Sequence, residues 1–446
     1  MKIKQFEDKA LSHFSYVIIS QGKMAVVDPE RDPAKYYAFA EANQAKITTI
    51  FETHPHADFI SAHVQMHKET GATIYTSKRV GADYPHLGFD DGDFFSMGEV
   101  VFKAINTPGH SPDSITIIAQ ENDKTVLFTG DTLFIGDVGR PDLRESNGNK
   151  KATRIELAKQ MYHSIQQKLN DLPDDALIYP AHGAGSLCGK GMSDASSSTL
   201  GNERQGNWAF QKQTEKEFIN TLLDAQPFIP HYFGHDVDMN KAGAANLQQA
   251  IAQIPFTLHV EQLDPGVLVI DTRDEAAFKK NHLPKSINIM ATKPSVKFET
   301  WLGSIVRPEE PFYLVAKTVE DLKKTLQRVA KIGYERQVLG LLTLAENIQV
   351  QEDSLNLQDF KTDTSAYTIV DIRNTSETEK GTFFKNALTI PLPELRERAN
   401  EIPTQKPIVV HCAGGYRSAA GSSIVANHID QVPVYDLGDA VKEFVK

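Results

Sequence analysis

The second half of the chain contains an internal repeat of about 100 residues, which restricts how it can fold. Val269-Ile-Asp-Thr-Arg273 is echoed by Ile369-Val-Asp-Ile-Arg373, and Pro311-Phe-Tyr-Leu-Val-Ala316 aligns with Pro407-Ile-Val-Val-His-Cys412. Self-similarity at this length indicates two related domains rather than a solenoid, whose repeats span about 20–50 residues. Each copy reads as strand, helix, strand, strand, helix, which predicts an open α/β domain.

The first half alternates short apolar strands with helical segments. We expect strands over 16–19, 24–27, 47–51, 73–76, 100–105, 115–119 and 125–129, and helices over 33–44, 60–70, 151–170 and 207–224. One core rarely extends beyond about 250–300 residues, so 446 residues predict several domains. The change of pattern predicts three α/β domains, over 1–244, 245–352 and 353–446.

Composition excludes some classes of partner and favours a compartment. The net charge of −11 disfavours nucleic acid and anionic membrane surfaces. The N-terminus has no apolar signal-peptide core, and no apolar stretch approaches the roughly 20 residues that span a bilayer. Two cysteines, Cys188 and Cys412, are too few for a disulfide framework. We therefore expect a cytoplasmic protein without membrane contact.

Histidine and aspartate residues gather just after several predicted strands. His54, His56 and Asp58 alternate directly after the strand over 47–51, so in an extended chain their side chains share one face. Three later apolar strands end in further candidate ligands, which are His110, Asp131 and His182. One such histidine alone is more often structural than a ligand, but four such stretches together predict a site for a first-row metal.

The run Thr53-His-Pro-His-Ala-Asp-Phe59 resembles the motif of the metallo-β-lactamase superfamily, Thr-His-x-His-x-Asp-His. The resemblance implies an αββα sandwich for the first domain. The seventh position of the motif supplies a ligand to a second metal in that superfamily, and Phe59 cannot ligate. The departure favours one metal over two.

Within the superfamily, the first domain is most similar to the persulfide dioxygenases, relatives of glyoxalase II. That resemblance implies one Fe(II) per chain, held by His54, His110 and Asp131, a facial set with open positions that is typical of non-haem iron oxygenases. It also implies that three further residues orient the ligands and ordered water, namely His56, Asp58 and His182. The alternative is that these three bind a second metal, as in a binuclear thioester hydrolase.

Arg140 lies in Gly136-Asp-Val-Gly-Arg-Pro-Asp-Leu143, which resembles a segment that follows the metal aspartate in the same subgroup. Its guanidinium could form a forked ion pair with a substrate carboxylate. An internal ion pair with Asp137 or Asp142 is an equally good interpretation.

A cysteine opens a glycine-bearing loop near the C-terminus, in His411-Cys-Ala-Gly-Gly-Tyr-Arg-Ser418. The loop follows an apolar strand and precedes a helix, so inward-pointing N–H groups, the helix dipole and Arg417 all favour the Cys412 thiolate. This pattern predicts an anion-binding nucleophile rather than a buried structural thiol. Four residues separate Cys412 from Arg417, one fewer than in Cys-x₅-Arg phosphatases.

The segment from 353 to 446 resembles a rhodanese domain, whose cysteine carries sulfane sulfur as a persulfide. The resemblance implies that Cys412 and Arg417 are catalytic and that the rest of the loop binds substrate through Gly414, Gly415 and Tyr416. In the middle copy Ala316 and Asp321 stand at the positions of the cysteine and the arginine. That copy therefore cannot carry sulfur, and we expect a structural or docking domain. The role of Cys188, six residues past His182, stays open.

The whole chain resembles bacterial persulfide dioxygenase–rhodanese fusion proteins. The resemblance implies oxidation of a small persulfide, of the glutathione, coenzyme A or bacillithiol type, by O₂ to sulfite and thiol. Transfer through Cys412 would then give or consume thiosulfate, in sulfide detoxification, and relatives associate as dimers or larger. A glyoxalase II-like hydrolase and a non-catalytic sulfur carrier are the alternatives.

Overall fold

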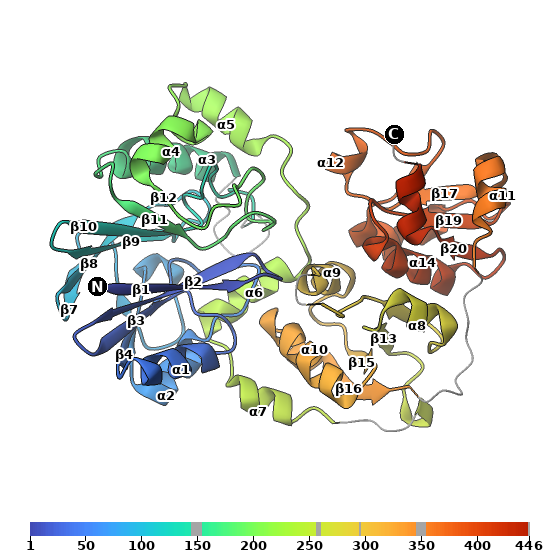
Figure 1. Ribbon diagram of the computed structural model, residues 1–446, viewed down its shortest axis with the longest axis horizontal. Coiled ribbons are helices and arrows are strands. Elements are labelled where there is room, and N and C mark those ends of the chain that lie inside the picture. Colours follow the sequence, from blue (N-terminus) through green and yellow to red (C-terminus); the bar gives the residue numbers. More distant parts are fainter. Residues whose placement is uncertain (144–153, 256–259, 294–295, 345–353, 445–446) are drawn as a thin grey trace. The chain divides into compact units, whose positions relative to one another are not determined.

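The computed structural model describes residues 1–143, 154–255, 260–293, 296–344 and 354–444 (Figure 1). The chain divides into two compact units, residues 1–249 with 331–333 and residues 250–330 with 334–446. The predicted domain boundary near 245 falls between helices α6 (Tyr232–Ala242) and α7 (Leu247–Ala252). The predicted boundary near 352 lies outside the described residues.

Within its described residues, the first unit contains two six-stranded sheets. One has the order β1-β2-β3-β4-β5-β6, formed by β1 (Lys2–Asp8), β2 (His13–Ser20), β3 (Lys23–Val27), β4 (Lys46–Phe51), β5 (Thr73–Thr76) and β6 (Leu87–Gly88). The other has the order β12-β11-β10-β9-β8-β7, formed by β7 (Phe94–Met97), β8 (Val100–Asn106), β9 (Ile115–Glu121), β10 (Lys124–Gly130), β11 (Leu177–Pro180) and β12 (Ser198–Thr199).

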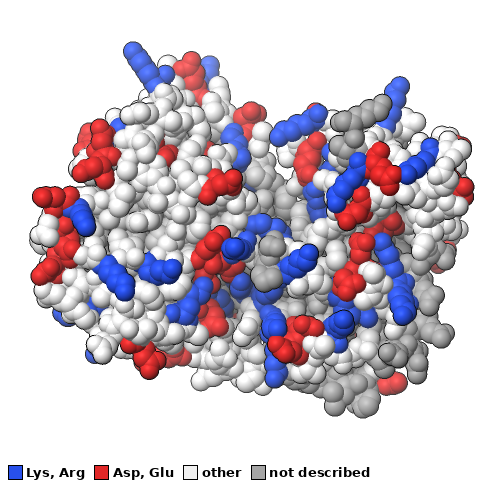
Figure 2. Space-filling model, viewed as in Figure 1, with Lys and Arg blue, Asp and Glu red and all other residues white. Residues whose placement is uncertain are grey.

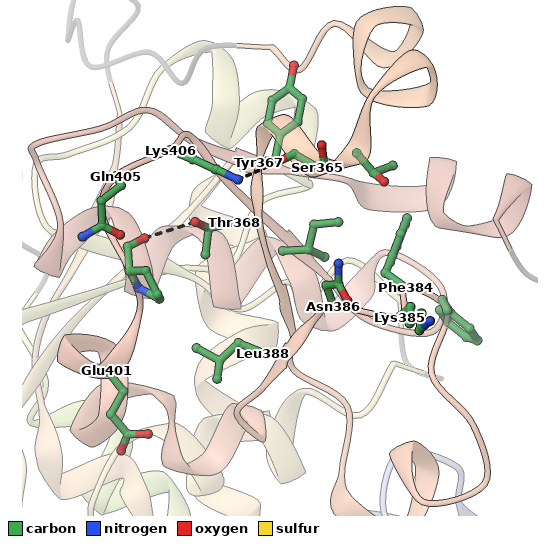
Figure 3. Close-up of a pocket in the computed structure, with 14 residues that line it drawn as sticks. Ser365, Tyr367, Thr368, Phe384, Lys385, Asn386, Leu388, Glu401, Gln405 and Lys406 are labelled. Atoms are coloured by element: carbon green, nitrogen blue, oxygen red, sulfur yellow. Dashed lines mark hydrogen bonds between the residues drawn. The ribbon is translucent and has the colours of Figure 1, made fainter.

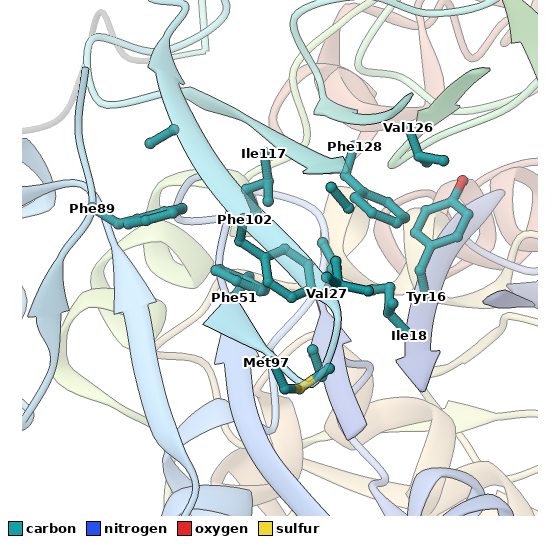
Figure 4. Close-up of a cluster of buried hydrophobic side chains, with 14 of the residues drawn as sticks. Tyr16, Ile18, Val27, Phe51, Phe89, Met97, Phe102, Ile117, Val126 and Phe128 are labelled. Carbon is teal, nitrogen blue, oxygen red and sulfur yellow. The ribbon is translucent and has the colours of Figure 1, made fainter. Parts of the chain in front are cut away.

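Alternating side chains of these strands fill the space between the two sheets. Tyr16 and Ile18 of β2 and Phe128 of β10 belong to this central cluster, together with Phe51 and Phe102 (Figure 4). Successive residues of a strand point to opposite faces. The residues between them therefore face outward, where they pack against helices instead.

Helices cover the outer face of each sheet. Residues of β2 and β3 pack against α1 (Ala34–Ala42) and α2 (His63–Thr70), and residues of β9 and β10 pack against α3 (Arg154–His163) and α5 (Glu215–Leu223). α4 (Leu200–Gly206) joins the second helical layer. A capping box between Thr214 and Glu217 fixes the start of α5. The predicted αββα sandwich is confirmed.

Most predicted elements of the first domain are present, with small differences at their ends. Four strands were not predicted, namely β1, β6, β7 and β12. All four lie at the edges of their sheets, and none has the long apolar run that marks a buried strand. The predicted helix over 151–170 begins in undescribed residues, and its described part continues beyond α3 as a π-helical stretch over Ser164–Leu169.

In the part of the second unit that the structure describes, there are two parallel four-stranded sheets with the same strand order, in line with the sequence repeat. The first sheet has the order β14-β13-β15-β16, formed by β13 (Leu268–Asp271), β14 (Ser286–Asn288), β15 (Phe312–Ala316) and β16 (Val338–Thr343). The second has the order β18-β17-β19-β20, formed by β17 (Thr368–Asp371), β18 (Leu388–Thr389), β19 (Ile408–His411) and β20 (Val434–Asp436).

Helices connect these parallel strands, as parallel pairing requires. The first copy has α8 (Glu275–Lys280), α9 (Phe298–Ile305) and α10 (Val319–Lys331). The second has α12 (Thr375–Thr378), α13 (Leu395–Arg398) and α14 (Tyr416–His428), preceded by α11 (Leu357–Thr362). Each copy is therefore an open α/β domain.

The surface carries charges of both signs. On the face drawn in Figure 2, lysine and arginine side chains are interspersed with aspartate and glutamate. Among the described residues, no helix combines the length and apolarity that crossing a bilayer requires.

Candidate metal centre and cysteine loop

The predicted ligands His54, His110 and Asp131 come together at the ends of three strands. They follow β4, β8 and β10, respectively, and each residue is at most 2% exposed. His54 Nε2 lies 3.8 Å and His110 Nε2 lies 3.6 Å from Asp131 Oδ2. These separations are too long for hydrogen bonds but close to the roughly 3.0–3.5 Å between ligand atoms that share a first-row ion. The three residues therefore fit one metal ion.

The second polar atom of each candidate ligand is held by a neighbouring group. Thr53 Oγ1 donates to Asp28, so it accepts from His54 Nδ1, 3.0 Å away. His110 Nδ1 donates to the Arg140 carbonyl at 2.8 Å. His182 Nδ1 donates to Asp131 Oδ1 at 2.7 Å. Such contacts fix ring tautomers, and the Nε2 atoms of both histidines and Oδ2 of the aspartate lie close to one another.

His182 links two carboxylates within this buried group. Besides Asp131, it contacts Asp58 through Nε2 at 2.8 Å. Burial alone would lower the pKa of His182, but the charges of Asp131 and Asp58 raise it to about 10. Burial would likewise raise the pKa of Asp131, and the adjoining His182 holds it well below its usual range. His182 therefore orients and charge-balances Asp131.

His56 and Asp58 also lie beside the three candidate ligands. One polar atom each of His56, Asp58 and His182 lies within 4.8 Å of the others. His56 Nε2 is 3.3 Å from Asp28 Oδ1, and this carboxylate raises the pKa of His56 against the opposite effect of burial. All six residues that the sequence predicted for the metal centre thus lie together.

Phe59 packs between two histidine rings. Its ring centroid lies 4.4 Å from that of His56 and 4.0 Å from that of His13. His13, at the start of β2, is fully buried and also faces the His182 ring. Sequence reasoning missed His13 because a single histidine at the start of an apolar strand has no spacing pattern that marks it.

Cys188 also lies beside this group of residues. The sequence by itself had left the role of Cys188 open. Its thiol, Asp131 and His182 each place a polar atom within 4.8 Å of the others, and Cys188 is only 1% exposed. Burial, together with the carboxylates of Asp58 and Asp131, raises the pKa of this thiol well above its usual value. Cys188 is therefore a neutral thiol at physiological pH in this arrangement.

The Arg140 guanidinium forms an internal ion pair, one of the two interpretations left open by the sequence. Its Nε and one terminal nitrogen donate to the two carboxylate oxygens of Asp142, each at 2.7 Å, and the side chain is buried. Binding of a substrate carboxylate by Arg140 would have to displace Asp142 and stays a prediction. The backbone of Arg140 has a separate role, because its carbonyl orients His110.

The cysteine loop connects β19 to α14. The backbone N–H of Gly415 donates to Cys412 Sγ at 3.2 Å. A hydrogen bond of this kind stabilises the thiolate form of a cysteine. Gly415 has a φ of +94°, and a Cβ there would meet the Asp439 backbone nitrogen at 2.9 Å. The turn therefore requires glycine. Cys412 itself is only 1% exposed.

Arg417 lies in the first turn of α14, with its guanidinium held by neighbours. Its two terminal nitrogens donate to Glu377 at 2.5 and 2.7 Å, and it also forms a side-chain contact with Cys412. The Trp301 ring lies 5.5 Å from the guanidinium carbon. Tyr416 Oη donates to the Met290 carbonyl at 2.8 Å. Trp301 and Met290 belong to the middle copy, so the copy without a cysteine contributes to the walls of this loop.

The middle copy lacks the groups that carry sulfur chemistry. Ala316 ends β15 where Cys412 follows β19, and Asp321 lies in the first turn of α10, where it accepts from Thr318 Oγ1 at 2.7 Å. A negative charge thus replaces the cation of the other copy.

A separate pocket opens in the last domain, at the amino ends of its strands (Figure 3). Thr368, Leu388 and Lys406 are among its lining residues, whereas Cys412 and Arg417 are not. Lys406 Nζ is engaged there by the Ser365 carbonyl at 2.7 Å. Because Cys412 follows the carboxyl end of β19, the pocket and the cysteine loop occupy opposite ends of the same sheet.

Comparisons with known proteins agree with this architecture. Residues 8–182 match the metallo-beta-lactamase superfamily, and residues 257–341 and 355–441 match the rhodanese-like domain. A crystal structure of a metallo-beta-lactamase from Staphylococcus aureus is 32% identical, with a TM-score of 0.67, and the match covers 77% of this chain and 99% of that one.

Two of the curated relatives each match less than half of the chain. Human mitochondrial persulfide dioxygenase is 33% identical over 130 residues, which is 29% of this chain and 46% of that protein. A hydroxyacylglutathione hydrolase of a Polaromonas species is 29% identical over 178 residues, 39% of this chain and 63% of that protein. The chain thus spans about half to two thirds of these relatives. From the sandwich fold and the matches together, the chain belongs to the metallo-beta-lactamase superfamily, with two rhodanese-like domains following the metallo-beta-lactamase domain.

Proposed function

We propose that the first domain is an iron-dependent persulfide dioxygenase and that the last domain transfers sulfur through Cys412. The first part of the proposal rests on the buried set of His54, His110 and Asp131. In each of these residues one polar atom faces the other two residues, and the second polar atom is held by a neighbouring group. Two histidines and one carboxylate with open positions are typical of non-haem Fe(II) oxygenases. The name of the human relative points the same way.

In this proposal the metal ion and the protein have different roles. Fe(II) held by the three residues would supply the binding and reduction of O₂, which redox-inactive zinc cannot supply. The chain keeps the ligand atoms aimed inward: the Arg140 carbonyl fixes His110, and His182 fixes Asp131. Phe59 fills the position of the seventh motif residue and packs on His56. A phenyl ring therefore stands where the superfamily motif has a ligand to a second metal. We propose one metal per chain for this reason.

The proposed overall reaction balances without a further reductant. A thiol persulfide, R–S–SH, reacts with O₂ and water to give R–SH and sulfurous acid, which ionises to sulfite. The terminal sulfur is oxidised and O₂ is reduced. The carrier thiol would be a small molecule of the glutathione, coenzyme A or bacillithiol type. Both cysteines are free, which suits the reducing cytoplasm we propose as the compartment.

The Cys412 loop would exchange sulfane sulfur with the product of the first domain. The Cys412 thiolate attacks the outer sulfur of thiosulfate, a sulfur–sulfur bond forms, and sulfite leaves with the electron pair of the bond that breaks. In reverse, a Cys412 persulfide gives its outer sulfur to sulfite, and thiosulfate forms. Coupling the two domains would remove both reactive persulfide and sulfite, as sulfide detoxification requires.

One experiment separates this proposal from a binuclear hydrolase. The His56, Asp58 and His182 group and the hydroxyacylglutathione hydrolase relative keep that alternative open. Metal content is measured on the full chain, followed by oxygen uptake with a panel of persulfides. We expect one iron per chain and turnover only with O₂. Two metals per chain together with anaerobic hydrolysis of a thioester would overturn the dioxygenase proposal.

A non-catalytic sulfur carrier is tested by His110→Ala. Such a carrier would use Cys412 alone, so losing a candidate metal ligand would change nothing. We expect oxygen uptake to disappear in this variant. Uptake that survives would remove the first domain from the proposed reaction.

A further inference from the structure

Glu377 occupies the side of Arg417 that an oxyanion would use. Its two carboxylate oxygens face the two terminal nitrogens of the guanidinium, at 2.5 and 2.7 Å. This two-point arrangement is how arginine generally binds planar or trigonal oxyanions. The side chains of Arg417 and Glu377 are only 13% and 33% exposed, so water screens the pair less than it would at the surface.

The carboxylate of Glu377 is itself fixed in place. It accepts the backbone N–H of Asn374 at 3.0 Å as part of the capping box that starts α12. Burial would raise the pKa of Glu377, but its contacts with Arg417 hold the pKa below the usual value. Glu377 is therefore an anion at neutral pH, held against the cysteine loop by its own helix.

Two further groups lie against the Arg417 guanidinium. Trp301 lies over it at 5.5 Å, and Cys412 contacts it from the loop. The nearby Arg373 is committed elsewhere, since it forms a two-point ion pair with Asp371 and lies 3.9 Å from the Phe383 ring. An incoming anion therefore meets an arginine whose charge Glu377 already balances.

From this arrangement we infer that Glu377 is a specificity-determining residue of the Cys412 loop, an internal anion that competes with sulfur oxyanions such as thiosulfate and sulfite for Arg417. The inference rests on the proposed sulfur transfer at Cys412. A persulfide can present its outer sulfur to Cys412 without using the guanidinium. A sulfonate-like group must displace at least one oxygen of Glu377. Glu377 thus weakens oxyanion binding relative to persulfide binding.

The test uses the full chain and the variant Glu377→Gln, which keeps the shape of the side chain and removes its charge. With thiosulfate as donor and cyanide as acceptor, we expect the KM for thiosulfate to fall about three- to tenfold, the effect of one partly screened ion pair. The control is Glu379→Gln, an exposed residue with the same change of charge, whose KM should stay at the wild-type value.

A second measurement needs no turnover. Iodoacetate, an anion, and neutral iodoacetamide both alkylate Cys412 with loss of iodide, and peptide mapping distinguishes it from Cys188. We expect Glu377→Gln to raise the iodoacetate-to-iodoacetamide rate ratio about three- to tenfold. Glu377→Asp, which keeps the charge, should raise the ratio less and provides a reading if the glutamine variant does not fold.

The inference is overturned if the thiosulfate KM and the alkylation ratio are unchanged or move the opposite way in Glu377→Gln. That pattern would mean that Glu377 only supports Arg417 as a scaffold. Absence of thiosulfate turnover in the wild type would instead count against the proposed transfer function. The alkylation ratio would still test Glu377 in that case.

Discussion

Gly139→Ala is expected to disable the metal centre while leaving the rest of the protein folded. Gly139 packs directly against two loops that carry candidate ligands. A Cβ at this position would lie 1.9 Å from the Asp131 carbonyl oxygen and 3.0 Å from both Cβ and Nδ1 of His110. None of these atoms belongs to the far end of a flexible side chain. The added methyl therefore has to move backbone or ligand.

The required movement sets the size of the effect. A carbon–oxygen contact relaxes to about 3.4 Å, so one of the two segments must shift by about 1.5 Å. Metal sites tolerate ligand displacements of only about 0.2 Å. We expect the affinity for iron to fall at least about tenfold. This is the smaller end of the losses in metal affinity that follow when residues supporting the metal ligands are altered. The overpacking itself should lower the free energy of unfolding by about 1–3 kcal/mol.

The assay compares iron per chain after anaerobic loading and dialysis, oxygen uptake with a persulfide, and thiosulfate turnover at Cys412. Gly206→Ala is the matched control, since it lies in the same unit and nothing within 4 Å would meet its Cβ. Thiosulfate turnover should survive in both variants. If Gly139→Ala binds one iron as tightly as wild type, then His110 and Asp131 do not hold the metal as proposed.

Three further predictions follow from other parts of the structure. Cys412→Ser should abolish sulfur transfer and leave oxygen uptake largely intact; loss of both activities would show instead that the two sites work as one unit. Phe59→Ala should lower the free energy of unfolding, measured by urea titration, by about 3–5 kcal/mol, because it removes a buried ring that packs on His13 and His56. The control is Phe94→Ala, at a 70% exposed position, which should change the free energy of unfolding little. Arg396→Gln should cost about 1 kcal/mol at pH 7, since Arg396 donates to both oxygens of the half-buried Glu310 at 2.7 Å. Although burial raises the pKa of Glu310, Arg396 holds it below its usual value, so this stabilisation is present at neutral pH and is lost as the pH falls through the folded pKa. Urea titrations of the two proteins should therefore converge as the pH is lowered into the acidic range, and a difference that does not shrink with falling pH would contradict the assignment.

The sequence alone determined the parts of this protein that depend on local pattern. The 100-residue repeat predicted two α/β domains, and both have the same strand order. The placement of His54, His110 and Asp131 after apolar strands predicted that they would meet, because strand ends of a layered fold share an edge. The length of the loop from Cys412 to Arg417 distinguished the rhodanese pattern from a phosphatase pattern. Each of these signals is read from short runs of neighbouring residues.

Only the tertiary structure decided which groups surround those residues. His13 and Cys188 lie beside the candidate metal ligands, Arg140 is paired with Asp142, and Glu377 faces Arg417. The sequence left these open because an isolated polar residue has no period, and its partner is set by how distant segments pack. The physical reason is that burial forces each such group to find a hydrogen-bond or charge partner, while the fold decides which partner is within reach.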